Sequence, residues 1–140
     1  ELAHPCQTPP SPITGGCLCG ACRYSTTAKP INSRACHCKR CQRATGAPLY
    51  ARVIVPLDQV SIRGPVSWWD NAETGLQRGF CSQCGSTLFS ARPAANTVGL
   101  TLGTLDEPNR HPPTEQIWTD ARQHWLSCLN DLPGFAQGPG

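Results

Sequence analysis

The sequence has no methionine, only three phenylalanines and two tyrosines, and charged residues occupy just 15% of its 140 positions. Apolar residues are in modest supply, at 39% of the chain. No apolar run approaches the roughly 20 residues of a membrane-spanning helix, and no run of five or more basic residues offers a phosphate-binding surface. The sequence therefore predicts one domain that binds neither membranes nor nucleic acids.

Proline and glycine are abundant instead, with 14 and 13 residues, which favours short strands and frequent turns over long helices. Alternating apolar residues predict strands at residues 50–55, 59–63 and 97–102, with weaker patterns at 76–80, 87–90 and 116–119. Helices should be short, such as a single turn after Cys41. We expect a mainly β domain over residues 15–132, a proline-rich flexible arm at 1–14 and a loose tail at 133–140.

Ten cysteines are the most informative feature of the sequence. In a secreted protein they would form disulfides, and in a cytoplasmic protein they would bind metal. The first residues show no basic start followed by an apolar stretch, so we expect no signal peptide and a cytoplasmic location. Two Cys-x-Cys pairs also favour metal, because alternate residues of an extended chain point the same way. Seven thiolates with two zinc ions would bring the formal charge of +3 close to zero.

The cysteines gather in three clusters. Residues 17–22 and 36–41 share the spacing Cys-x-Cys-x-x-Cys, and residues 81–84 form a Cys-x-x-Cys knuckle followed by glycine. Such a knuckle places two sulfurs on one zinc ion, and glycine accepts the positive φ that the turn needs. Cys17 with Cys19 is the natural completing pair. Joining segments about 60 residues apart would restrict the unfolded chain as a disulfide does, by roughly 4 kcal/mol, which predicts a closed structural site.

Cys36, Cys38 and Cys41 lie within six residues and can form one face of a tetrahedron. Three protein ligands leave a fourth position for water or substrate, as in catalytic zinc sites. An incoming thiol would lose its proton there, because the cation stabilises thiolate. The alternative is that Cys22 supplies a fourth ligand, which would give two closed sites and no chemistry. Spacing alone does not choose between the two.

The cysteine motifs stand in a wider pattern of landmarks. In order, these are Gly16-Cys17-Leu18-Cys19-Gly20 with Arg23-Tyr24; Cys36-His37-Cys38-x-x-Cys41 running to Thr45-Gly46-Ala47; Phe80-Cys81-x-x-Cys84-Gly85-Ser86; and Gly103-Thr104-Leu105-Asp106 with Ile117-Trp118 and Trp125. Over about residues 15–136 this pattern resembles the glutathione-dependent formaldehyde-activating and centromere protein V family.

The resemblance implies a β-tent of several small coiled antiparallel sheets with two zinc ions. It assigns a structural zinc to Cys17, Cys19, Cys81 and Cys84 and a catalytic zinc to Cys36, Cys38 and Cys41. It also implies a carbon–sulfur lyase or synthase that acts on the adduct of a thiol such as glutathione with a small aldehyde, as in S-(hydroxymethyl)glutathione formation from formaldehyde. The substrate thiolate would bind the open zinc. The alternative function is a non-catalytic, zinc-stabilised interaction module of the same fold.

The remaining candidates have simpler interpretations. Cys22 departs from the family pattern and is expected to be a buried free thiol, while Cys6 and Cys128 should be plain thiols. All four tryptophans are expected in the core, although Trp68 could instead form a wall of the substrate pocket. No pair of carboxylates and no Ser-His arrangement suggests a second mechanism.

Three polar residues near the cysteines, and one further along, also have candidate roles. Lys39 and Arg43 are either solvated or attract an anionic substrate such as glutathione. His37 should point away from the metal and support it through packing or a hydrogen bond. Asp106 is expected to cap or stabilise a turn.

Overall fold

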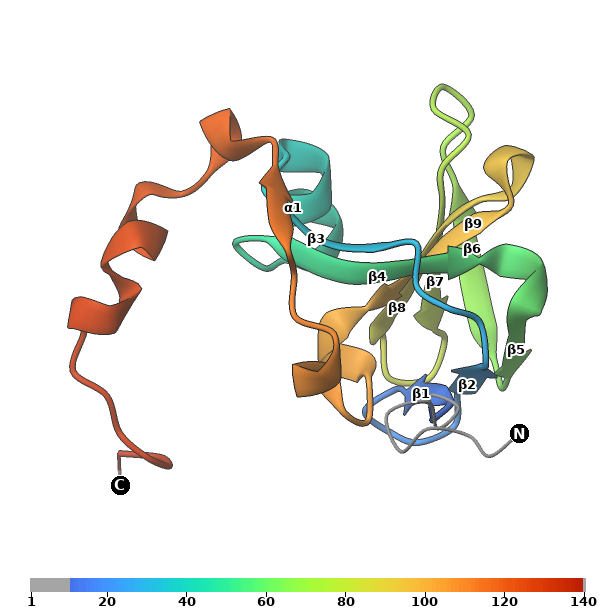
Figure 1. Cartoon of the computed structure of the whole chain (residues 1–140), viewed down its shortest axis with the longest axis horizontal. Coiled ribbons are helices and arrows are strands. Elements are labelled where there is room, and N and C mark those ends of the chain that lie inside the picture. The colour runs from blue at the N-terminus through green and yellow to red at the C-terminus, as the bar shows by residue number, and fades with distance from the viewer. Residues whose placement is uncertain (1–10, 140) are drawn as a thin grey trace, which may run out of the picture.

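The structure is a computed structural model that describes residues 11–139. This range contains ten strands, one α-helix and several 3₁₀-helical turns (Figure 1). The strands are β1 Ile13–Gly16, β2 Arg23–Thr26, β3 Asn32–Cys36, β4 Tyr50–Pro56, β5 Val60–Arg63, β6 Val66–Asp70, β7 Gln77–Cys81, β8 Thr87–Arg92, β9 Thr97–Thr101 and β10 Glu115–Ile117. The helix α1 is Lys39–Thr45, and the 3₁₀ turns are Leu57–Gln59, Pro93–Ala95, Leu102–Thr104, Pro108–Arg110, Thr119–Ala121 and His124–Asp131. The predicted mainly β class is confirmed.

The strands form two sheets. The smaller has the order β1-β2-β5, and the larger has the order β10-β3-β4-β9-β8-β7-β6. All pairings are antiparallel except that of β10 with β3, which is parallel. The small antiparallel sheets implied by the family resemblance correspond to these two sheets, of three and seven strands. Only one pair of strands in them, β10 with β3, is parallel.

Apolar residues from both sheets share one core. On β4 and β9 the alternation predicted from sequence buries Val53, Val98 and Leu100 completely. Tyr24 of the smaller sheet meets Phe89 of β8 edge-to-face, with ring centroids 5.2 Å apart. These contacts join the small sheet to the large one, which gives the cysteine-bearing turns of both a fixed relative position.

Helix α1 begins at Lys39, three residues before Gln42, where a turn after Cys41 would begin. Its N-cap is Cys38, whose backbone is extended and whose sulfur accepts a hydrogen bond from the Cys41 backbone N–H at 3.3 Å. It ends at Gly46, which has a left-handed φ of 69° and donates its N–H to the Gln42 carbonyl. Cys38, a candidate metal ligand, therefore also caps the helix that carries the next candidate ligand, Cys41.

Two expectations about boundaries and burial need correction. The ordered unit begins before residue 15, because Ile13 on β1 is buried at 5% exposure; residues 1–10 of the expected arm, with Cys6, lie outside the described range. The tryptophans were expected in the core, but Trp118 and Trp125 are 63% and 46% exposed. After β10 the chain leaves the sheets and runs along one side of the molecule (Figure 1), and none of residues 118–139 is buried. Within residues 11–139, no helix has the length and apolar character needed to span a membrane.

Candidate metal centres and active site

The first cluster joins two turns that are far apart in sequence. Cys17 and Cys19 follow β1, while Cys81 ends β7 and Cys84 lies in the turn before β8. The four sulfurs all lie within 4.8 Å of one another. Two neighbouring pairs, Cys17–Cys19 and Cys19–Cys81, are separated by 3.6 and 3.8 Å. A tetrahedral zinc site with Zn–S bonds of about 2.3 Å has sulfurs about 3.8 Å apart, so these residues fit zinc.

Backbone and hydroxyl donors point at this cluster. The Cys22 N–H lies 3.2 Å from the Cys17 sulfur, and the Cys84 N–H lies 3.5 Å from the Cys81 sulfur. The Ser86 hydroxyl, 3.2 Å from the Cys84 sulfur, is the main cause that lowers the pKa of this thiol to about 5. Donors of this kind favour thiolate, which is the form that binds metal.

Cys22 lies beside the first cluster and not at the second. It is 1% exposed and belongs to the same packed core as Cys17 and Cys81. Burial, together with the neighbouring Cys81 thiol, raises its pKa to about 12. It is therefore a buried thiol behind a cluster that already has four sulfurs, as expected, and it does not reach the three-cysteine cluster.

The second cluster is built over a single bend of the chain. Cys36 ends β3, Cys38 caps α1 and Cys41 lies in its first turn. Their sulfurs lie within 4.8 Å of one another, and no fourth cysteine and no histidine, aspartate or glutamate of residues 11–139 joins them. Burial raises the pKa of the Cys41 thiol to about 12. Such a thiol needs an adjacent cation to become a ligand, and three soft sulfur ligands suit zinc.

A layer of hydrogen bonds supports this cluster from behind. His37 is 1% exposed, and its Nε2 lies 2.8 Å from the Gln116 Oε1 on β10. The buried Gln42 donates from Nε2 to the His37 carbonyl at 2.6 Å and to the Ala121 carbonyl at 3.1 Å. These bonds fix the loop that carries Cys36 and Cys38 to the last strand and to the segment after it. The expectation that His37 supports the site without pointing at the metal is consistent with this geometry.

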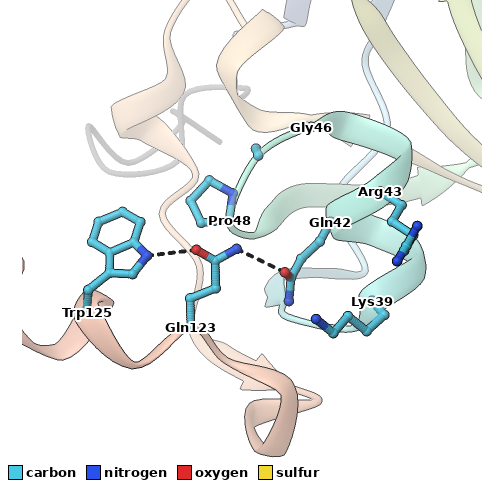
Figure 2. A pocket seen from close by; sticks show the side chains of 8 residues that line it. Lys39, Gln42, Arg43, Gly46, Pro48, Gln123 and Trp125 are labelled. Atoms are coloured by element: carbon cyan, nitrogen blue, oxygen red, sulfur yellow. Dashed lines mark hydrogen bonds between the residues drawn. The ribbon is translucent and has the colours of Figure 1, made fainter.

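A pocket of about 370 Å³ lies outside α1, between this helix and the segment that carries Gln123 and Trp125 (Figure 2). Lys39 and Arg43 of α1 line it on one side, and Trp125 lines it on the other. Trp125 Nε1 donates to Gln123 Oε1 at 2.7 Å, and Gln123 Nε2 donates to Gln42 Oε1 at 3.0 Å. The pocket thus combines two cationic side chains, an indole ring and amide groups, and the same Gln42 connects it to the cysteine loop.

Comparison with protein families gives a match over residues 12–121, well over half of the chain, to the family described as glutathione-dependent formaldehyde-activating enzyme. The chain belongs to the glutathione-dependent formaldehyde-activating enzyme family. Among solved structures it is similar to the crystal structure of a Rhodobacter sphaeroides protein, with a TM-score of 0.57 and 21% identity over 74% of this chain and 98% of that one. At that identity the similarity supports the fold alone. Among curated proteins, none matches the sequence.

Trp68 and Asp106, two residues that the sequence analysis singled out, belong to neither cysteine cluster. Trp68 on β6 stacks on the core ring of Phe89 at 5.6 Å and remains 42% exposed. Trp68 pairs with Gly79 of β7. Because neighbouring residues of a strand point to opposite faces, the Trp68 side chain lies on the other face of the sheet from Arg78, which precedes Gly79. Asp106 was expected to cap a turn; instead it accepts hydrogen bonds from Arg23 and Thr14 and thereby ties β1 and β2 to the segment after β9.

Three polar residues near the clusters were missed by sequence reasoning. Arg78 places Nη2 3.8 Å from the Cys41 sulfur, although the two residues are 37 positions apart. Gln42 and Gln123 form the hydrogen-bonded support described above. Nothing in their local sequence signals a role, because each depends on the pairing of distant segments. The one available signal was the family resemblance of the cysteine motifs, which indicates that residues around the cysteines have a functional role.

Proposed function

We propose that this protein is a zinc-dependent carbon–sulfur lyase or synthase that acts on the adduct of a thiol, such as glutathione, with a small aldehyde. The observation that supports this most is the difference between the two cysteine clusters. One offers four sulfurs and the other offers three, with no fourth ligand side chain among residues 11–139. Zinc bound to three protein ligands keeps a position for an exchangeable ligand. We therefore assign Cys36, Cys38 and Cys41 to a catalytic zinc.

The chemistry is balanced without any further reactant. When bound, zinc would supply a Lewis acid that favours the thiolate form of a substrate thiol. In the forward direction a carbon–sulfur bond forms between the thiol sulfur and the aldehyde carbon, and the thiol proton passes to the carbonyl oxygen. The reverse direction breaks that bond and returns the proton to sulfur. Arg78, beside Cys41, adds positive charge where sulfur carries negative charge.

The pocket outside α1 suits the peptide part of the thiol. Glutathione carries two carboxylates, and Lys39 and Arg43 present cationic groups at the pocket wall. Gln42 and Gln123 offer amides for peptide groups, and the Trp125 ring provides an apolar surface. The structural zinc, in this proposal, is held by Cys17, Cys19, Cys81 and Cys84, with Cys22 as an unliganded neighbour.

The experiment is exchange NMR of ¹³C-formaldehyde with glutathione, with and without the zinc-loaded protein. We expect the protein to increase the rate of interconversion between formaldehyde and the adduct. Cys41→Ala should abolish the increase, whereas the matched variant Cys128→Ser, which removes an exposed thiol elsewhere, should retain it. A rate equal to that of the uncatalysed reaction for this thiol and for other small thiols would favour the alternative, a non-catalytic interaction module.

A further inference from the structure

Two arginines lie on the face of the large sheet that carries the three-cysteine cluster. Arg52 on β4 is two residues from Tyr50, whose register partner on β3 is Cys36. Arg78 on β7 contacts the Cys41 sulfur through Nη2 at 3.8 Å. Because side chains alternate along a strand, Arg52, Tyr50 and Cys36 share one face.

The hydroxyl of Tyr50, a residue that is 3% exposed, bonds to the register partners of both arginines. This hydroxyl donates to Ser90 Oγ at 3.0 Å and accepts from Thr101 Oγ1 at 3.3 Å; Ser90 is the register partner of Arg78, and Thr101 that of Arg52. Both arginines are therefore register neighbours of the residues that bond the Tyr50 hydroxyl, on the sheet face that carries the cysteines.

Space for the Arg52 side chain depends on a glycine. A Cβ added at Gly99 of β9 would lie 2.4 Å from Ser90 Oγ and 2.9 Å from Arg52 Cγ. A side chain at this position would collide with Ser90 and Arg52. Gly99 thus leaves room for the Arg52 side chain and the Ser90 hydroxyl.

Among residues 11–139, neither arginine has a carboxylate partner, and the ion pairs there involve Arg23, Arg34 and Arg110. The Nη1 atoms of Arg52 and Arg78 are both buried and have no hydrogen-bond acceptor in the part of the chain that the structure describes. Buried charged donors without an acceptor are costly, so an acceptor from outside the protein, either water or a ligand, is expected at these atoms.

We propose that Arg52 and Arg78 form an anion subsite that binds a carboxylate carried by the substrate on the carbon attached to its sulfur. The proposal rests on the proposed function and defines its substrate class: the preferred aldehyde component is a 2-oxo acid, whose carboxylate lies next to the reacting carbonyl and adds binding that an uncharged aldehyde such as formaldehyde lacks. The carbon–sulfur bond forms and breaks as before, and the carboxylate is unchanged by the reaction.

Charge compensation is the simpler role for these arginines. Three thiolates with one divalent cation carry one negative charge, and a substrate thiolate adds another, so two arginines could serve only to neutralise the sulfurs. This role does not account for the unpaired Nη1 groups, since sulfur is a weak acceptor. A carboxylate offers two oxygens that match the planar guanidinium donors and accepts charge-assisted hydrogen bonds.

The test compares two small thiols that differ only in charge. Mercaptoacetate places a carboxylate one carbon from sulfur, and mercaptoacetamide is its neutral counterpart. Binding of each to the zinc-loaded protein is measured by calorimetry, and the ratio of the two affinities is compared among variants. We expect wild type to favour the acid by about tenfold to a hundredfold. Arg52→Gln with Arg78→Gln should reduce the ratio to near one; the loss of positive charge beside the sulfurs weakens both thiols alike and cancels in the ratio.

Controls separate the subsite from metal chelation and from general charge effects. Arg63→Gln removes an exposed arginine of β5 and should leave the ratio unchanged. Chelation of the metal by the carboxylate would survive the loss of both arginines, so a ratio that persists in the double variant overturns the subsite. Arg78→Lys preserves charge but loses the planar fork; a full wild-type ratio in this variant would also contradict the proposal and indicate charge compensation alone.

The outcomes distinguish this proposal from the one on which it rests. If both thiols bind and wild type does not prefer the acid, the subsite is refuted and the open metal position stands. If neither thiol binds the zinc-loaded protein, the proposed function fails and the subsite fails with it. Should the double variant not fold, the wild-type ratio and the Arg78→Lys ratio still decide the matter.

Discussion

Replacing one ligand in each cluster should affect stability very differently. Cys81 is completely buried, and the first cluster joins it to Cys19, 62 residues earlier in the chain. If zinc links these segments, it restricts the unfolded chain like a cross-link of that length, by about 4 kcal/mol. The second cluster closes only the short loop from Cys36 to Cys41, for which the same relation gives about 2 kcal/mol.

We therefore expect Cys81→Ser to lower the melting temperature by roughly 10 °C, and Cys41→Ser by about half as much. Each variant should lose one of two zinc ions. The assay combines calorimetric melting with metal analysis of the purified proteins. Cys128→Ser serves as the control, since its thiol is exposed and belongs to neither cluster.

The reasoning would be refuted if Cys81→Ser melted within about 2 °C of wild type, or if Cys41→Ser proved the less stable of the two. The first result would mean that the four-cysteine cluster does not hold the two sheets together through metal. The second would mean that the helix α1 and its cysteine cap contribute more to the fold than the long-range cluster does.

Three further predictions concern single residues. Ser86→Ala removes the hydroxyl that lowers the pKa of Cys84; the pKa should rise, protons should compete better with zinc, and metal release in an acid titration with a chelating dye should begin at higher pH. Gly64→Ala should destabilise the protein by about 3 kcal/mol in denaturant unfolding, because Gly64 has a φ of +101° and its Cβ would lie 2.1 Å from the Ala21 carbonyl oxygen; an unchanged midpoint would contradict this. Arg43→Gln should raise KM for glutathione about fivefold with little change in kcat, and an unaltered KM would remove Arg43 from the binding pocket.

The sequence predicted those strands whose alternation is uninterrupted. β4 and β9 lie at the centre of the large sheet, and their patterns of Val53, Val55, Val98 and Leu100 locate them correctly. The short strands β1, β2, β3 and β6 were missed. β6 carries two partly exposed tryptophans and β3 alternates small and polar residues, so neither shows the pattern that a half-buried strand would give.

The cysteine clusters could be predicted because metal ligation imposes spacing on the chain itself. A bend that brings three sulfurs together within residues 36–41 is a local property, and the 81–84 knuckle is another. The pairing of that knuckle with Cys17 and Cys19 is long-range, and family resemblance supported it before the structure brought the four sulfurs together.

The surroundings of the clusters could not be predicted in the same way. Arg78 meets Cys41 although β4, β9 and β8 lie between β3 and β7 in the large sheet, so this contact depends on how the whole sheet curves. The exposure of Trp118 depends on where the chain leaves the sheets, and composition says nothing of this. The residues of the core can be predicted from their side-chain types, whereas these polar contacts depend on how distant segments are arranged in the fold.

The central claim is that one of two zinc ions has a coordination position that a substrate sulfur can fill. Zinc X-ray absorption measures the number of sulfurs directly, averaged over both ions. With four sulfurs at one cluster and three at the other, we expect an average of about 3.5 sulfurs per zinc, rising to about 4 when glutathione is added. An average of 4 before addition, unchanged by glutathione, would contradict the account.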